Sequence, residues 1–231
     1  MDGKTPGPGL RNLITDVPGL RVGQSHDSAV RTGVTVILPD DRAVCACDVR
    51  GGGPGTRETD ALAPENLVEA VDAVVLSGGS VYGLAAADGV TAWLGARGRG
   101  YGMAEGVPKS PVVPAAILFD TANGGDKAWG EAPPYRDLGR AAVAAAGLDV
   151  ALGTAGAGYG AVAGGLKGGT GSASVVSFDG FTVNTPPRVP HSTPMRSSTA
   201  AITSMSRSCT PSIAISPPVM TPTTAQLPAS M

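Results

Sequence analysis

Aromatic residues and histidines are scarce in this chain, and its cysteines do not have the pattern of a disulfide framework. Phe, Trp and Tyr make up 4% of the 231 residues, with three cysteines and two histidines. Cys45 and Cys47 alternate along a strand-like segment and so face one side, whereas Cys209 lies far away. Neither His26 nor His191 has a neighbour at metal-ligand spacing, so we interpret both as surface or capping residues. The cysteine pair is therefore expected to be buried and reduced, and no metal site is predicted.

The chain also lacks an excess of basic residues and any long apolar run. Its formal net charge is −2, which argues against a nucleic-acid partner. No apolar segment is long enough to span a bilayer, and residues 1–10 lack the apolar centre of a signal peptide. We therefore expect a cytoplasmic protein with no membrane partner. The length suits one domain or a small pair of domains.

The most informative stretch combines a strand, a glycine turn and a helix. Residues 71–76 form a short, β-branched apolar run that is typical of a strand buried on both faces. Gly78 and Gly79 permit a positive φ, and Ser80 is placed to cap a helix that continues to Arg97. Such a turn offers free backbone N–H groups to negative charge, so Gly78, Gly79 and Ser80 are candidate substrate-binding residues. Packing alone also produces glycine turns, and this alternative stays open.

The flanking segments predict further strands and helices. Residues 32–38 and 43–49 have the pattern of two strands, and the turn residues between them indicate a hairpin. Pro64 favours the start of a short helix before the organising strand. Residues 115–119 read as another strand, and Asp137 is placed to cap a helix over 138–146. Strands that alternate with helices indicate an α/β fold.

A glycine-rich loop with alternating charges follows residues 43–49. It contains Arg50 and Arg57, which are suited to holding a carboxylate. That carboxylate is either a substrate's or one of the protein's own, at Glu58 and Asp60. We favour the internal ion pairs.

A second glycine-rich stretch covers residues 151–175, with nine glycines in 25 positions and Lys167 as its one charge. So many glycines indicate a backbone that needs unusual φ values or close approach. Gly156, Gly158 and Ala161 match a loose dinucleotide fingerprint, but two more Gly-Gly pairs stand where the required helix would be. Nucleotide binding is therefore kept as an alternative function, and no cofactor is predicted.

Several long segments occur in one order along residues 12–183 and together carry a resemblance. They are residues 15–23, 48–59, 76–80 with 82–84, 113–120, 156–158 and 165–174. In this combination they resemble the L-aminopeptidase/D-esterase family, the DmpA-type peptidases that include β-aminopeptidases and nylon-oligomer hydrolases. The resemblance implies a four-layer α/β/β/α sandwich and a homo-oligomer in an intact family member.

The resemblance also implies a mechanism and site residues. Family members cut themselves ahead of a serine or threonine, which becomes an N-terminal nucleophile whose α-amine serves as base. The implied substrate is a peptide or small amide with a free N-terminal residue. Tyr82 falls at the position that similar enzymes place beside the oxyanion, and Lys167 is expected to face the cleft. Thr154 stands where relatives often have asparagine.

The last part of the sequence differs in character. Residues 181–231 contain nine each of serine, threonine and proline, and no Asp or Glu follows Asp179. We expect residues 1–180 to be the larger-subunit part of a peptidase, and 181–231 to be a disordered or frame-shifted tail without strands. Asn184-Thr185 superficially resembles the cleavage pair, which makes Thr185 a weak candidate nucleophile. The chain is therefore expected to be a truncated family member without its nucleophile segment, with a catalytically dead fragment as an alternative.

Overall fold

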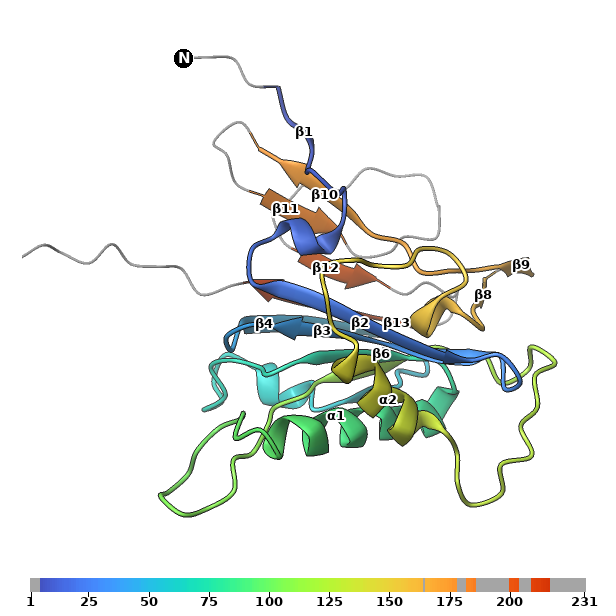
Figure 1. The fold of residues 1–231 in the computed structure, drawn as a ribbon, viewed down its shortest axis with the longest axis horizontal. Coiled ribbons are helices and arrows are strands. Elements are labelled where there is room, and N and C mark those ends of the chain that lie inside the picture. Colours follow the sequence, from blue (N-terminus) through green and yellow to red (C-terminus); the bar gives the residue numbers. More distant parts are fainter. Residues whose placement is uncertain (1–4, 164, 178–181, 186–199, 204–208, 217–231) are drawn as a thin grey trace, which may run out of the picture.

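The computed structural model describes residues 5–163, 165–177, 182–185, 200–203 and 209–216. The elements lie in layers (Figure 1). Two α-helices cover one face of a five-stranded sheet, and a three-stranded sheet lies against its other face. These are three of the four layers of an α/β/β/α sandwich. A second helical layer is not found among the described residues.

The five-stranded sheet is mixed, with the order β2-β3-β6-β7-β5. Its strands are β2 (Leu20–Asp27), β3 (Thr32–Pro39), β6 (Val74–Ser77), β7 (Ala115–Ile117) and β5 (Thr56–Arg57). β6 and β7 are parallel, whereas the other neighbours are antiparallel. A helical crossover joins β6 to β7, so both strands end at the same edge of the sheet. That edge holds the glycine turn.

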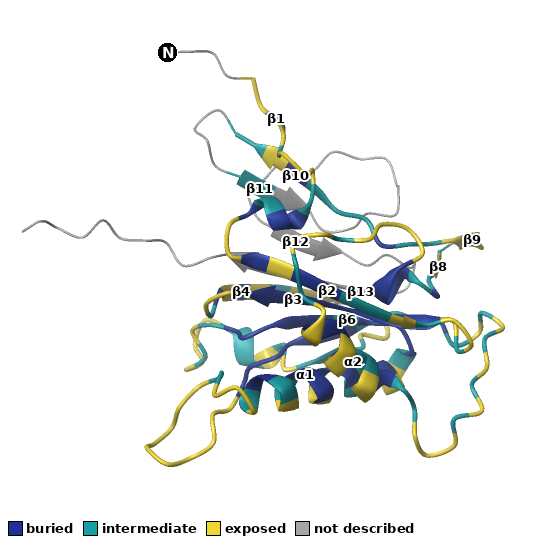
Figure 2. Cartoon of the chain, in the orientation of Figure 1, coloured by how far each residue is buried: buried dark blue, intermediate teal, exposed yellow. Residues whose placement is uncertain are grey.

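Strand β3 lies between two apolar cores, and all eight of its residues are buried (Figure 2). Val34, Val36 and Leu38 face the helices. Ile37 points the other way, into a core that includes Cys45 of the second sheet. A strand whose alternate side chains enter two cores has to be largely apolar throughout. The strand predicted at 32–38 is therefore confirmed.

The hairpin predicted between residues 32–38 and 43–49 is wrong. β4 (Val44–Gly51) is a strand, but it pairs with β13 (Cys209–Ser216) and not with β3. β3 pairs with β2 and β6 instead. The turn at 40–43 carries the chain from one sheet to the other, which buries alternate β4 side chains between the sheets.

The two cysteines of β4 behave as the alternation predicted. Cys45 is buried, Cys47 is partly buried against the same core, and both are free thiols. Burial raises the pKa of the Cys45 thiol to about 12, and it also raises the pKa of Cys47. Over the described ranges, no group of three or more His, Cys, Asp or Glu side chains is placed to hold a metal ion.

The helices α1 (Ala86–Gly95) and α2 (Tyr135–Ala144) pack closely side by side. A Cβ on Gly89 would lie 2.0 Å from the carbonyl oxygen of Arg136. A Cβ on Gly139 would lie 2.1 Å from the carbonyl oxygen of Ala86. Glycine at both positions therefore lets the two backbones meet. Within the part of the chain that the structure describes, neither helix nor any other is long and apolar enough to cross a membrane.

The predicted helix starts need correction. Ser80 does not cap a helix: it opens a 3-10 helix (Ser80–Ala85) before α1, Gly79 holds the cap position, and the φ of Ser80 is 53°. Ser80 is itself the first residue of the 3-10 helix, so the cap lies one residue before it. Asp137 lies in the first turn of α2, where Pro134 is the cap.

The helix predicted from Pro64 is also wrong, because residues 63–70 contain turns and bends without a helix. A short 3-10 helix, Asp60–Leu62, comes just before them. Leu67, which the apolar pattern assigned to the buried face, is 88% exposed. Val68 is partly buried against the core and Val71 is fully buried, but the chain brings them there without a helix.

Three strands fall in the segment that was expected to lack them. β11 (Thr182–Thr185) pairs with β10 (Ala173–Val176), which also pairs with β1 (Gly7–Pro8). β12 (Ala200–Thr203) pairs with β13, which lies between β12 and β4. Pro211 of β13 faces β4 alone, beyond the end of β12, so its missing N–H is tolerated there. The other residues of 181–231 lie outside the described ranges.

Candidate functional site

The candidate site lies where β6 and β7 end, at the glycine turn. Three backbone N–H groups of the turn are engaged within the protein. That of Gly78 donates to the Gly33 carbonyl at 2.9 Å, that of Gly79 to Asp120 at 2.6 Å, and that of Ser80 to the Leu118 carbonyl at 3.0 Å. The expectation that these N–H groups are free for a ligand is therefore wrong. They fix the turn between β3 and β7.

Asp120 is the anchor of this turn. Its side chain is buried, and residue exposure is 2%. Oδ1 accepts the Gly79 N–H at 2.6 Å, and Oδ2 accepts the Thr32 hydroxyl at 2.7 Å. Burial raises the pKa of Asp120, although these hydrogen bonds and the charge of Lys127 act in the opposite direction. A desolvated carboxyl thus joins strand β3, the turn after β6 and the loop after β7.

The glycines of the turn are required by space. A Cβ on Gly78 would lie 2.0 Å from the Asp120 Oδ2 atom. Gly79 has a φ of 86°, and a Cβ there would lie 2.0 Å from the ring of Tyr135. A Cβ on Gly83 would lie 1.8 Å from the Gly78 carbonyl oxygen. The glycines of this turn therefore have a packing role, which is the alternative that the sequence left open.

Ser80 gives the turn a strained backbone. Its φ of 53° is unusual for a residue with a side chain, and it follows directly on the left-handed Gly79. Strain of this kind persists where the surrounding contacts enforce it, and it is concentrated at functional sites. The side chain of Ser80 is half-buried, at the surface of the turn.

Tyr82 stands on the first turn of the 3-10 helix and is 50% exposed. Its ring meets Trp129 edge-to-face, with 5.6 Å between ring centroids. Trp129 meets Tyr135 in the same way at 5.8 Å, and Tyr135 is fully buried under the turn. Burial raises the pKa of Tyr135 to about 12. The exposed tyrosine is thus held by two successive edge-to-face ring contacts, which begin at Tyr135 beneath Gly79.

The second glycine-rich stretch packs against the same part of the molecule, beside Asp120 and strand β3. Gly156–Gly158 form a short 3-10 helix whose Ala157 N–H donates to the Thr35 hydroxyl at 3.0 Å. A Cβ on Gly160 would lie 2.6 Å from the Asp120 Oδ2 atom. The close approach predicted for these glycines is therefore observed. A hairpin, β8 (Val162–Ala163) with β9 (Leu166–Lys167), follows in place of the helix that a dinucleotide fingerprint needs.

The remaining predicted residues lie around this second stretch. Lys167 donates to the carbonyls of Gly158 at 3.2 Å and Gly168 at 2.6 Å, and partial burial lowers its pKa. Thr154 is exposed just before the 3-10 helix. Thr185 ends β11 opposite Ala173. The structure thus joins the turn and Tyr82 into one corner, with Lys167 tied to the adjoining segment.

Sequence reasoning missed several residues of the corner. Asp120 and Thr32 hold the turn, and Asn123 joins it to the second stretch by donating to the Gly160 carbonyl at 3.2 Å. Lys127 donates to Asn123 at 3.1 Å and to the Val30 carbonyl. The one signal in the sequence was the group of polar residues directly after strand 115–119.

The arginines of the first glycine-rich loop form internal ion pairs, as favoured, but with other partners. Arg50 pairs with Asp48 at 2.6 Å, and Arg57 pairs with Asp88 of α1. Glu58 instead accepts the Val113 N–H at 2.8 Å. These contacts fasten the loop to its surroundings.

Curated proteins similar to this chain include an uncharacterised aminopeptidase of Mycobacterium tuberculosis, 52% identical over 180 residues. The match covers 74% of this chain and 51% of that protein. A 6-aminohexanoate-oligomer endohydrolase of a Kocuria species is 32% identical over 157 residues, 68% of this chain and 40% of that one. The chain thus spans about half the length of the curated relatives it matches.

Solved structures have the same fold. A Burkholderia β-aminopeptidase superposes with a TM-score of 0.61 at 25% identity, covering 78% of this chain and 52% of that one. The L-aminopeptidase D-Ala-esterase/amidase of Ochrobactrum anthropi is described as a variant of the N-terminal-nucleophile hydrolase fold. It superposes with a TM-score of 0.61 at 24% identity, covering 79% of this chain and 53% of that one. The profile of peptidase family S58 matches residues 12–185. With three quarters of its length covered by that profile, the chain belongs to peptidase family S58.

Proposed function

We propose that this chain supplies the oxyanion- and substrate-binding part of an N-terminal-nucleophile aminopeptidase or amidase. The reaction is hydrolysis of the amide bond after the N-terminal residue of a peptide or small amide. Family membership supports the class of reaction, and relatives named as aminopeptidases support the preference for a free N-terminus. No cofactor takes part in this proposal. The intact enzyme would be a cytoplasmic homo-oligomer.

The observation that carries the proposal is the exposed Tyr82 on a turn fixed by buried hydrogen bonds. The N–H groups of residues 78–80 are engaged, so they cannot stabilise an oxyanion directly. A tyrosine hydroxyl is a suitable donor, because a preorganised donor needs no rearrangement as charge develops. Tyr82 is 50% exposed and its ring is held by Trp129. The role of the glycine turn is therefore to place this hydroxyl.

The nucleophile follows the mechanism implied for the family. The hydroxyl of the new N-terminal serine or threonine attacks the carbonyl carbon, and its α-amine, with a pKa of about 7.7 to 8.0, takes the hydroxyl proton near neutral pH. The amide C–N bond then breaks, the amine leaves with that proton, and water hydrolyses the ester that remains. Thr185 is the candidate within this chain, where it ends β11. The other source is the portion of the longer relatives that this chain does not cover. Lys167 and Thr154 are proposed to line the substrate's approach from the second glycine-rich stretch.

Reconstitution tests the function. The chain is purified alone and together with the part of the M. tuberculosis relative that it does not cover. We expect release of the chromogenic amine from alanyl anilides by the combined chains, and none from the N-acetylated substrates, since the proposal requires a free N-terminus. The intact relative serves as the positive control. If the intact relative is active, and the two chains associate without any turnover, the proposal is contradicted.

A further inference from the structure

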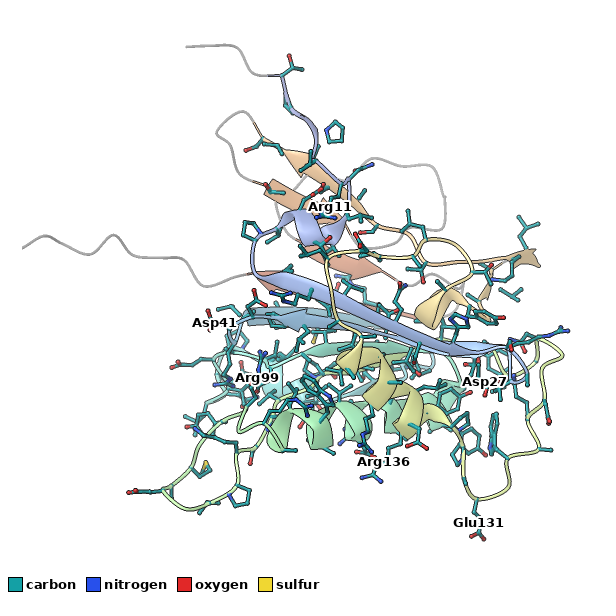
Figure 3. All side chains as sticks on the ribbon, in the orientation of Figure 1. Arg11, Asp27, Asp41, Arg99, Glu131 and Arg136 are labelled. Carbon is teal, nitrogen blue, oxygen red and sulfur yellow. The ribbon has the colours of Figure 1, made fainter. Side chains whose placement is uncertain are left out.

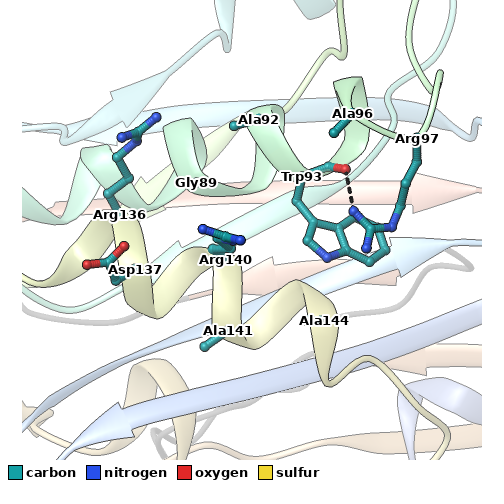
Figure 4. A pocket seen from close by; sticks show the side chains of 10 residues that line it. All are labelled: Gly89, Ala92, Trp93, Ala96, Arg97, Arg136, Asp137, Arg140, Ala141 and Ala144. Carbon is teal, nitrogen blue, oxygen red and sulfur yellow. Dashed lines mark hydrogen bonds between the residues drawn. The ribbon is translucent and has the colours of Figure 1, made fainter.

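The helix layer has a groove on the side facing away from the sheet (Figure 4). The groove has a volume of about 640 Å³ and runs between α1 and α2. Its floor is made of small residues because the two helices approach closely at Gly89 and Gly139. These small lining residues are Gly89, Ala92, Ala96, Ala141 and Ala144.

Basic side chains dominate the walls of this groove. Arg97, Arg136 and Arg140 line it, and Asp137 is the one acidic residue among the lining residues. All three arginines are exposed, and Arg136 points away from the sheet (Figure 3). Five ion pairs occur among the described residues, and none of them includes any of these three arginines. The groove therefore carries three arginines against one carboxylate, and none of the three arginines forms an ion pair within the described residues.

One of the arginines is already ordered. The guanidinium of Arg97 lies 3.6 Å from the ring centroid of Trp93, and its NH1 atom donates to the Trp93 carbonyl at 3.0 Å. A stacked guanidinium keeps part of its donor edge available while losing little further side-chain freedom when it binds an anion. Trp93 also provides a fluorescent reporter inside the groove.

The three charges are spread along the groove rather than gathered at one point. In Figure 4 the two helices run in the same direction, and Arg97 stands at the far end from Arg136. Arg136 and Arg140 are four residues apart on a helix, a rise of about 6 Å. Alternate side chains of an extended peptide repeat at about 6.6 Å, which is close to this spacing.

We propose that this groove binds an extended acidic peptide segment whose alternate residues are Asp or Glu. Its carboxylates would pair in turn with Arg136, Arg140 and Arg97, and its backbone would lie over the floor of small residues. Charge complementarity and the matching spacing favour this occupant over a compact anion, which would meet one arginine at a time. The proposal does not depend on the catalytic role of the glycine turn.

Trp93 fluorescence tests the proposal on the full chain. A blocked peptide of alternating Glu and Ser is titrated beside its Gln-Ser counterpart and inorganic tripolyphosphate, at low and high salt. We expect saturable binding of the Glu-Ser peptide, weaker at high salt, with no signal in Trp93→Phe. The double change Arg136→Gln and Arg140→Gln is expected to weaken binding about tenfold, because both exposed side chains keep their packing but lose their charge.

A matched control uses Arg21→Gln, which removes an exposed arginine that pairs with Asp40. That variant is expected to bind the Glu-Ser peptide like the parent. Thermal unfolding checks that each variant is folded, and the salt dependence of the parent tests the proposal without any variant. Equal binding of the Gln-Ser peptide, binding of tripolyphosphate alone, or unchanged binding by the folded double variant would each overturn the proposal.

Discussion

Replacement of Asp120 with alanine is expected to lower the free energy of unfolding by about 3 kcal/mol, because two hydrogen bonds to a carboxyl are lost at once. One of them leaves the Gly79 N–H without its partner beneath the turn. The other leaves the Thr32 hydroxyl unpaired in a fully buried position. Urea unfolding followed by circular dichroism measures the change. A loss within about 0.5 kcal/mol, the range of ordinary surface changes, would contradict the anchoring role.

Asp120→Asn is the matched control, because an amide of the same shape can accept the Gly79 N–H and donate to the Thr32 hydroxyl. It should keep most of the stability that alanine loses. The folded-state pKa of Asp120 is raised above 3.8, so the folded state holds this proton more tightly than the unfolded state. The resulting stabilisation is full below pH 3.8 and is lost as the pH rises through the folded-state pKa. We expect this fall in the parent and not in Asp120→Asn; identical pH profiles would contradict it.

Gly79→Ala is expected to destabilise the protein by about 2 to 5 kcal/mol through two separate effects. The left-handed backbone costs a residue with a side chain about 1 to 2 kcal/mol, and overpacking adds about 1 to 3 kcal/mol. The φ of Gly79 is 86°, and the new Cβ would lie 2.0 Å from the Tyr135 ring. Tyr135 is fully buried against α1 and β6 residues, so it has little room to move.

Gly98→Ala separates the two effects. Gly98 also has a positive φ, of 69°, but nothing lies within 4 Å of an added Cβ. Its replacement should therefore show the backbone cost alone, about 1 to 2 kcal/mol. Both variants are compared by urea unfolding under one set of conditions. Equal losses for the two variants would show that the contact between Gly79 and Tyr135 does not constrain the turn.

Local pattern predicted the central strands because their environment was uniform. All residues of β3 are buried, and such a strand has to be apolar along its length whichever neighbours it has. Its neighbours could not be predicted in the same way. β4 follows β3 after a short turn, yet it pairs with β13, about 165 residues later. Its partner depends on the sheet in which the face of β4 that carries Cys45 becomes buried, and the local pattern does not specify that sheet.

The glycine turn was predicted in position but not in its hydrogen bonds. Gly78, Gly79 and Ser80 do form a strand-to-helix turn at the sheet edge. Their N–H groups are engaged by Gly33, Asp120 and Leu118, which are distant in sequence and supplied by other strands and loops. Sequence spacing indicated the turn but not the carboxyl that anchors it. In the proposed function the turn acts through what it positions, and Tyr82 is the exposed group beside it.

The central claim is that Tyr82, on its anchored turn, stabilises the oxyanion. Its most direct test is the kcat of the reconstituted enzyme with Tyr82→Phe, which removes one hydroxyl and leaves the ring contact with Trp129. Tyr101→Phe, at an exposed tyrosine beyond the other end of α1, is the control. The account predicts a fall in kcat of about 100-fold with a small change in KM for Tyr82→Phe, and no change for Tyr101→Phe. A kcat for Tyr82→Phe within about twofold of the parent would contradict the claim.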